Sequence, residues 1–280
     1  MQFDLLYHSF ACLLAVLVII IMAKFLYDKI TTNIDEDKLI KAGQLAFAYR
    51  RAGQYLGIVI AMAGVLSGKP HGIVEDVLSV LGWGVMAVVF LLVAGKVNDK
   101  LILRHINNTS ECNSGNDAVG ICEAGGYIAT GLIMYGCLTG NGTNVEDSII
   151  STAVFFVIGQ VVLLLMTYVY EYITPYALIR DIENGNKCAA VTLAAKMVAI
   201  GIILQNAIAG DFTTWNEGLS GFAYTGLVGI GTLIAVEKII SLILLKGSMS
   251  KYVDKQLNMS AVLVTQLPVL GLALLITKLF

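Results

Sequence analysis

The sequence predicts an all-α, polytopic membrane protein with eight transmembrane helices, arranged as four hairpins that share one orientation. The first observation behind this is composition, since 57% of the 280 residues are hydrophobic and only 14% are charged. A soluble domain carries about 25% charged residues. The second observation is a repeated pattern in which Gly-Asn or Gly-Gln opens a long apolar run, and such an internal period indicates a repeat architecture.

Eight apolar stretches are long enough to cross a hydrocarbon core of about 30 Å as helices. Lipid offers no hydrogen-bond partners to the backbone, and a helix satisfies its own, so each stretch is expected to be helical. The first stretch has no basic segment before it and no small-residue cleavage site, so we expect it to be retained. The expected spans are residues 5–26, 44–67, 73–96, 117–139, 149–170, 187–209, 218–245 and 257–278.

Basic residues are distributed unevenly between the loops. The long loops after the first, third, fifth and seventh spans carry most of the Lys and Arg residues, whereas Lys69 is the single basic residue in the short loops. Because Lys and Arg favour the cytoplasmic side of a membrane, the long loops are expected in the cytoplasm and both termini outside.

The chain is expected to form a single membrane domain, residues 1–280, built from four tandem repeats. Each repeat has a first helix, a charged amphipathic linker and a second helix, so all copies share one orientation, as in a parallel repeat. An acid begins the linker in three copies, at Asp28, Asp99 and Glu171. The repeats are placed at about 1–70, 71–142, 143–212 and 213–280.

A Gly-Asn pair is expected to mark the start of each second helix. Glycine permits a turn with positive φ, and an asparagine side chain can cap the helix by accepting from a backbone N–H two or three residues on. Gln44 is a poorer cap, and Leu257 replaces the glycine in the fourth copy. The expected turn and cap residues are Gly43, Gln44, Gly115, Asn116, Gly185, Asn186 and Asn258.

The order of acid, linker, Gly-Asn and a Gly/Ala-rich helix resembles the YjfL-type bacterial inner-membrane family, domain of unknown function three-fifty. The third copy carries the resemblance from Glu171 to Gly210, with residues 183–190 as its core, and the second copy matches at residues 115–118. The first and fourth copies depart at Gln44 and Leu257. The resemblance implies a multi-pass protein of the cell inner (plasma) membrane, and it supplies no activity and no catalytic residues.

Ionisable side chains inside the spans are the candidate functional groups, because placing one in lipid costs about 2.5–3.5 kcal/mol. Glu123 lies about 12 Å into its helix from the Gly-Asn turn and Lys196 about 16 Å. Opposite charges on neighbouring repeats predict two ion pairs, Arg51 with Glu123 and Lys196 with Glu237. Arg50 is expected to reach partly toward water. Further polar candidates inside the spans are Lys238, Gln205 and Asn206.

These charges have two interpretations, which the sequence does not separate. They can be internal ion pairs that fix how the hairpins meet, or they can line a polar path. The first function predicted is a transporter or channel for a small solute or ion. The alternative is a membrane scaffold or stress-response component that recruits a cytoplasmic partner through its linkers.

Other classes of function find little support in the sequence. No nucleophile or metal-ligand spacing appears, and the five cysteines are scattered, so we expect neither an enzyme, nor a cofactor, nor a metal site. No basic tract suggests nucleic acid. The expected partner is the lipid bilayer, and both a homo-oligomer and a cytoplasmic protein partner are compatible with the pattern.

Overall fold

The computed structural model describes residues 2–31, 34–68, 72–140, 144–245, 252–253 and 257–280. These residues form helices and connections, and no β-strand occurs among them. The helices are α1 (Gln2–Ile30), α2 (Glu36–Lys41), α3 (Leu45–Val65), α4 (Ile73–Leu101), α5 (Asn108–Asn113), α6 (Asp117–Leu138), α7 (Val145–Ile173), α8 (Leu178–Glu183), α9 (Lys187–Ile208), α10 (Trp215–Leu245) and α11 (Met259–Leu279).

Seven helices in the described part of the chain are long and apolar enough to cross a membrane: α1, α4, α6, α7, α9, α10 and α11. This confirms the prediction of an all-helical, multi-pass membrane protein. Helix α3 has 21 residues but is less apolar, because Arg50, Arg51 and Gln54 lie within it. The expected count of eight spans therefore depends on α3.

Helices α1, α4 and α7 extend beyond the expected spans. Helix α4 continues to Leu101 and α7 to Ile173, although their apolar runs end earlier. A helix needs only its own backbone hydrogen bonds to continue into the polar interface. As a result, Asp28, Asp99 and Glu171 lie in the last turns of α1, α4 and α7 rather than in loops.

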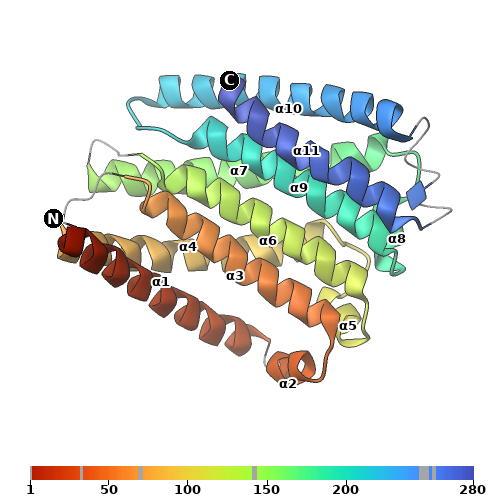
Figure 1. The fold of residues 1–280 in the computed structure, drawn as a ribbon, viewed down its shortest axis with the longest axis horizontal. Coiled ribbons are helices and arrows are strands. Elements are labelled where there is room, and N and C mark those ends of the chain that lie inside the picture. Colours follow the sequence, from red (N-terminus) through yellow and green to blue (C-terminus); the bar gives the residue numbers. More distant parts are fainter. Residues whose placement is uncertain (1, 32–33, 69–71, 141–143, 246–251, 254–256) are drawn as a thin grey trace.

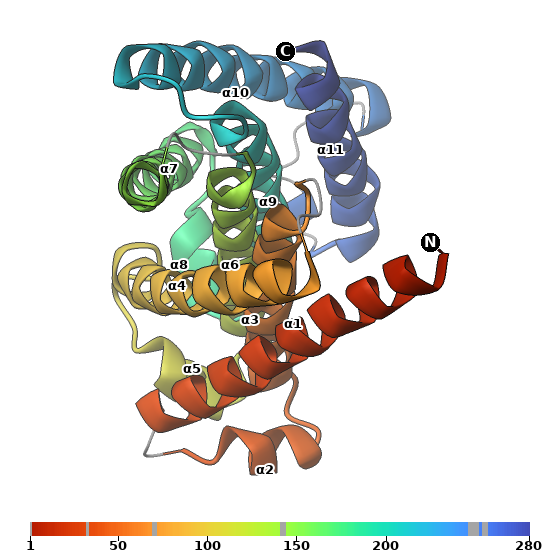
Figure 2. The same ribbon diagram turned by 90° about the vertical axis from the view of Figure 1, so that its left-hand side faces the viewer.

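The helices form a row with flanking elements. Helices α3, α6, α9 and α11 follow one another in this row (Figure 1). Helices α4 and α7 lie on one side of it (Figure 2). The short helices α2, α5 and α8 gather at one end of the molecule, which we call the linker end, while α4, α7 and α10 begin at the opposite end (Figure 1).

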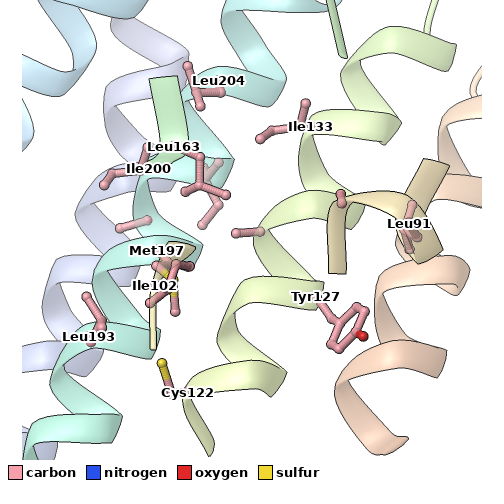
Figure 3. Close-up of a cluster of buried hydrophobic side chains, with 14 of the residues drawn as sticks. Leu91, Ile102, Cys122, Tyr127, Ile133, Leu163, Leu193, Met197, Ile200 and Leu204 are labelled. Atoms are coloured by element: carbon pink, nitrogen blue, oxygen red, sulfur yellow. The ribbon is translucent and has the colours of Figure 1, made fainter. Parts of the chain in front are cut away.

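Neighbouring helices of the row approach each other at backbone contact distance. A Cβ atom added to Gly57 of α3 would lie 2.5 Å from the carbonyl oxygen of Tyr127 in α6, and one added to Gly125 of α6 would lie 2.6 Å from Cα of Ala194 in α9. Small residues are thus required at these crossings, as is typical of helices packed in lipid. Around them, large apolar side chains such as Leu163 and Met197 fill the core (Figure 3).

Candidate functional site

The turns that precede α3, α6 and α9 share one conformation. Gly43, Gly115 and Gly185 all have φ of +89°. The amide oxygens of the asparagines that follow the turns accept from the backbone N–H three residues on, at Asn116, Asn186 and Asn258, whereas Gln44 makes no such bond. Leu257 takes the corresponding turn position before α11, with φ of +47°.

Amide side chains at these turns also bind segments that lie further along the chain. Nδ2 of Asn116 donates to the carbonyl of Glu183 at 3.0 Å, and Nδ2 of Asn186 donates to the carbonyl of Val253 at 3.1 Å. Gln44 donates in the same way to the carbonyl of Cys112 at 3.0 Å. Sequence reasoning missed this role. The available signal was the amide itself, since Ser, Thr or Asp would also cap a helix but carry no NH₂ group.

Glu123 is bound by Arg50 and not by Arg51. Nε of Arg50 lies 2.5 Å from Oε2 of Glu123, and a terminal nitrogen donates to Oε1 at 2.8 Å. Both side chains are buried, so the expectation that Arg50 reaches toward water is wrong. The predicted pair of Arg51 with Glu123 is wrong as well, because Arg51 donates instead to Asp28 and Glu36, each at 2.7 Å.

Helix geometry explains this exchange of partners. Consecutive residues of an α-helix point about 100° apart. Arg50 therefore meets α5 and α6, where it also donates to the hydroxyl of Thr109 at 3.3 Å. Arg51 meets α1 and α2, and it lies over the ring of Tyr27. A superposition of repeats shows which positions are equivalent, but it does not show which of two adjacent arginines turns toward a given neighbour.

A pocket lies between the end of α4, α5 and the first turns of α6. Its lining includes Asn98, Asp99, Asn108, Glu123 and Tyr127. Nδ2 of Asn108 donates to Oε1 of Glu123 at 3.1 Å and to Oδ1 of Asp99 at 3.4 Å. The two carboxylates therefore lie on either side of one amide group, close to the linker end.

The thiol of Cys112 also faces this site from α5. Its sulfur lies 3.6 Å from Oε2 of Glu123. Burial is the main cause that raises the pKa of the Cys112 thiol, and the charge of Glu123 raises it further. The thiol is therefore neutral and acts as a weak donor to the carboxylate.

Polar groups continue from this pocket into the helical bundle. Nδ2 of Asn98 lies 3.5 Å from the hydroxyl of Thr130, which donates to Oε1 of Gln160 at 3.3 Å. All three side chains are buried. Thr130 lies seven residues beyond Glu123, or about 10 Å further along α6. We call Glu123, Asp99, Asn98, Thr130 and Gln160 the polar line.

Lys196 and Glu237 form a separate ion pair between α9 and α10. Lys196 is buried, and its Nζ lies 4.3 Å from the ring centroid of Tyr170. Lys238 is exposed. Gln205 and Asn206 are half-buried near the end of α9, about 14 Å along the helix from Lys196. The structure therefore does not bring these three side chains to the ion pair.

The three acids that begin the linkers have different surroundings. Asp28 is held by Lys24 at 2.8 Å and by Arg51, and Glu171 lies 3.4 Å from Arg104. Among the described residues no salt bridge is formed to Asp99. The described part of the chain also contains no cluster of three or more His, Cys, Asp or Glu side chains that could hold a metal ion.

Comparison with known proteins identifies relatives without a known activity. The family model described as Domain of Unknown Function (DUF350) matches residues 1–138 and 144–280. A "UPF0719 transmembrane protein" of Mycolicibacterium paratuberculosis (strain ATCC BAA-968 / K-10) is 29% identical over 107 residues, which are 38% of this chain and 70% of the relative. No solved structure matches the chain.

Proposed function

The chain belongs to the transmembrane family described as Domain of Unknown Function (DUF350), as its sequence predicted, and from this premise we propose that it is a transporter or channel for an ion or small solute. The polar line is the observation that carries this proposal. Charged and amide side chains inside membrane helices are costly, so they are retained where they serve a path or a pair.

The geometry of the polar line supports a path more than a set of isolated pairs. It begins at the pocket near the linker end, where Asp99 lies two residues before the end of α4. It continues through side chains of α4, α6 and α7 that can each donate and accept a hydrogen bond. Its far end is Gln160, whose buried Nε2 has no partner in the described structure.

The proposed architecture has eight crossings, made by four hairpins of one orientation. Helix α3 would be about 31 Å long, enough for the hydrocarbon core. It also lies in the same row as α6, α9 and α11. Two successive matches to one family model are what a duplicated pair of hairpins would give.

We further propose that the linker end faces the cytoplasm of the inner membrane, with both termini outside. Single cysteines at the exposed positions Arg180 and Glu146 test this orientation in a background without the native cysteines. A maleimide reagent that does not cross membranes is expected to label Glu146→Cys from outside intact cells. Arg180→Cys should react only after the membrane is opened, and labelling of both from outside would refute the orientation.

Transport is tested by flux measurements on purified protein in liposomes. The panel contains H⁺, Na⁺, K⁺ and small neutral solutes. Thr130→Val removes the central hydroxyl of the polar line and keeps the side-chain shape, so it is expected to reduce flux at least several-fold. Thr167→Val is the matched control, because the equally buried hydroxyl of Thr167 donates only to a carbonyl of its own helix, at 2.9 Å. Flux equal to that of empty liposomes for the whole panel would refute the proposal.

A second candidate function is a scaffold that recruits a cytoplasmic protein. This function is favoured by two observations: the charges of Lys196 and Glu237 neutralise each other, and the helices of the row are tightly packed. Both features suit a rigid protein that presents its short helices at one end. A photocrosslinker at the exposed Arg180 should then capture one cytoplasmic protein reproducibly. A crosslinker at Glu146, at the opposite end, is the control. Capture at both positions, or at neither, would argue against recruitment through the linkers.

A further inference from the structure

We propose that the pocket between α4, α5 and α6 binds one monovalent positive charge, a proton or an alkali cation, between Asp99 and Glu123. The inference rests on the proposed transport function and deepens it by naming the class of ion that enters the polar line. Its first support is the imbalance of charge around the pocket.

The pocket has two carboxylates and one adjacent cation. Arg50 directs both Nε and a terminal nitrogen to Glu123, so Glu123 is compensated. Asp99 accepts a hydrogen bond from the neutral amide of Asn108, and no salt bridge joins it to a cation in the described part of the chain. One negative charge is therefore left over at the half-buried carboxylate of Asp99, and two carboxylates that share a site disfavour full ionisation of both. A proton or a bound cation removes this imbalance.

Groups on the surrounding elements do not supply the missing positive charge. Helix α2 contributes the acid Glu36, which lies 3.6 Å from Arg50 and accepts from Arg51. Helix α5 contributes the neutral thiol of Cys112. Helix α6 adds Tyr127 to the lining. The described neighbours of the site thus add acids and neutral groups, and the cations among them already bind carboxylates.

Two amide oxygens complete the site. Oδ1 of Asn98 and Oδ1 of Asn108 are buried without a hydrogen-bond partner in the described structure. Both residues line the pocket, and their exposed fractions are only 7% and 5%. Nδ2 of Asn108 donates to both carboxylates, so the oxygen of the same amide is the acceptor left over. Carboxylate and amide oxygens are the ligands of hard cations, and free acceptors equally suit a hydronium ion.

The size of the pocket suits a single small occupant. The space open to the centre of a water molecule is about 20 Å³. One ordered water needs about 10–15 Å³ measured in this way. The pocket therefore accommodates one water, one hydronium ion or one alkali cation that has lost most of its hydration shell.

Among the described residues of the second half of the chain, we find no equivalent imbalance. Glu237-Lys238-Ile239 corresponds in pattern to Asp99-Lys100-Leu101, but its acid is already paired with Lys196. Eight residues past the turn, where α6 has Glu123, α11 has the uncharged Thr265. The first half thus has one carboxylate more than the second at the compared positions, that of Glu123, and the proposed site is confined to the first half.

Binding is tested on the full-length protein in detergent. Thermal unfolding is measured in NaCl, KCl and choline chloride at constant ionic strength, across a range of pH. Infrared difference spectra follow the C=O stretch of a protonated carboxylic acid. A melting temperature raised by a few degrees in Na⁺ or K⁺ relative to choline would identify an alkali cation. No alkali effect, but a protonated-acid band that persists near neutral pH and disappears on deprotonation, would identify a proton. In that case stability falls as pH rises and the proton is lost.

Asp99→Asn is expected to abolish either response, because it removes the uncompensated charge and leaves Arg50 with Glu123. Glu171→Gln is the matched control at the same position of the third repeat, and it should respond as the parent does. If Asp99→Asn does not fold, Asn98→Leu removes one oxygen ligand without a change of charge and should weaken the response. Equal responses in parent and Asp99→Asn, no response in the parent, or binding of divalent cations in preference to Na⁺ and K⁺ would each overturn the proposal.

The two proposals fail in different experiments. Cation binding without flux in liposomes would remove the transport function and leave the site. Flux that depends on Thr130 but proceeds without binding at Asp99 would leave the transport function and remove the site.

Discussion

The bond between Arg50 and Glu123 is expected to be the strongest single electrostatic contact in the first half of the chain. Its two charge-assisted hydrogen bonds have lengths of 2.5 and 2.8 Å, and the side chains of both partners are buried. Removal of one partner of a buried pair leaves an uncompensated charge and costs about 3–5 kcal/mol. We therefore expect Arg50→Met to lower the free energy of unfolding by about 3 kcal/mol or more.

The double variant distinguishes this mechanism from a general loss of packing. With both charges replaced by methionine, neither member of the pair remains as an ion without its partner, so stability should return to within about 1 kcal/mol of the parent. Glu123→Met alone should cost somewhat less than Arg50→Met, because Glu36 lies 3.6 Å from Arg50 and compensates part of its charge. The coupling energy follows from a double-mutant cycle.

Equilibrium unfolding in mixed detergent micelles, driven by added SDS, measures all four proteins. Lys24→Met is the control for a partly exposed ion pair, since the Lys24 side chain is 38% exposed, and it should cost less than about 1 kcal/mol. A cycle between Arg51 and Glu123 should give a coupling energy several-fold smaller than that for Arg50. A coupling energy below about 1 kcal/mol for Arg50 and Glu123, or a larger one for Arg51, would refute the assignment of partners.

Three further predictions concern the row of helices and the linkers. Gly57→Ala should destabilise the protein by about 1–3 kcal/mol through overpacking against α6. Gly82→Ala is the control and should be neutral or stabilising, because nothing lies within 4 Å of the added methyl group. Equal unfolding curves of the two variants in SDS would contradict the close helix contact. Asn186→Ala should cost about 1–2 kcal/mol, because the cap and the bond to the next linker are lost together, and Asn186→Asp, which retains only the cap acceptor, should recover part of the stability in the same assay. Burial raises the pKa of the Cys112 thiol, so iodoacetamide near pH 8 should alkylate it slowly until the protein unfolds. Because the folded state retains this proton, stability should decline as pH rises above the ordinary thiol pKa of about 8.5, and equal alkylation rates before and after unfolding would contradict its burial.

The membrane class and the family follow from the sequence because both depend on long patterns. An apolar run such as that of α4 has few alternatives to a membrane helix. Its end is less predictable, since Asn98, Asp99 and Lys100 interrupt the apolar run while the backbone hydrogen bonds continue to Leu101. The linker acids were therefore expected in loops, although they belong to helices.

The candidate site depends on geometry that repeat comparison cannot supply. Lys196 is the single charged side chain of α9 beyond its first residue, so its pairing with the in-span acid Glu237 could be anticipated. Arg50 and Arg51 are adjacent, and their partners depend on the rotation of α3 against α1 and α6. Asn108 lies in a linker with no periodic pattern, so nothing in the sequence indicates that its amide bridges two carboxylates.

The bonds between successive linkers give the array a polarity. At each of three junctions the donor lies earlier in the chain and the carbonyl later, with Gln44, Asn116 and Asn186 as the donors. Such head-to-tail contacts have no internal stopping point, because the surface offered by one unit is the surface the next unit needs. The three contacts therefore set the order of α3, α6, α9 and α11 in the row, and they do not close it into a ring.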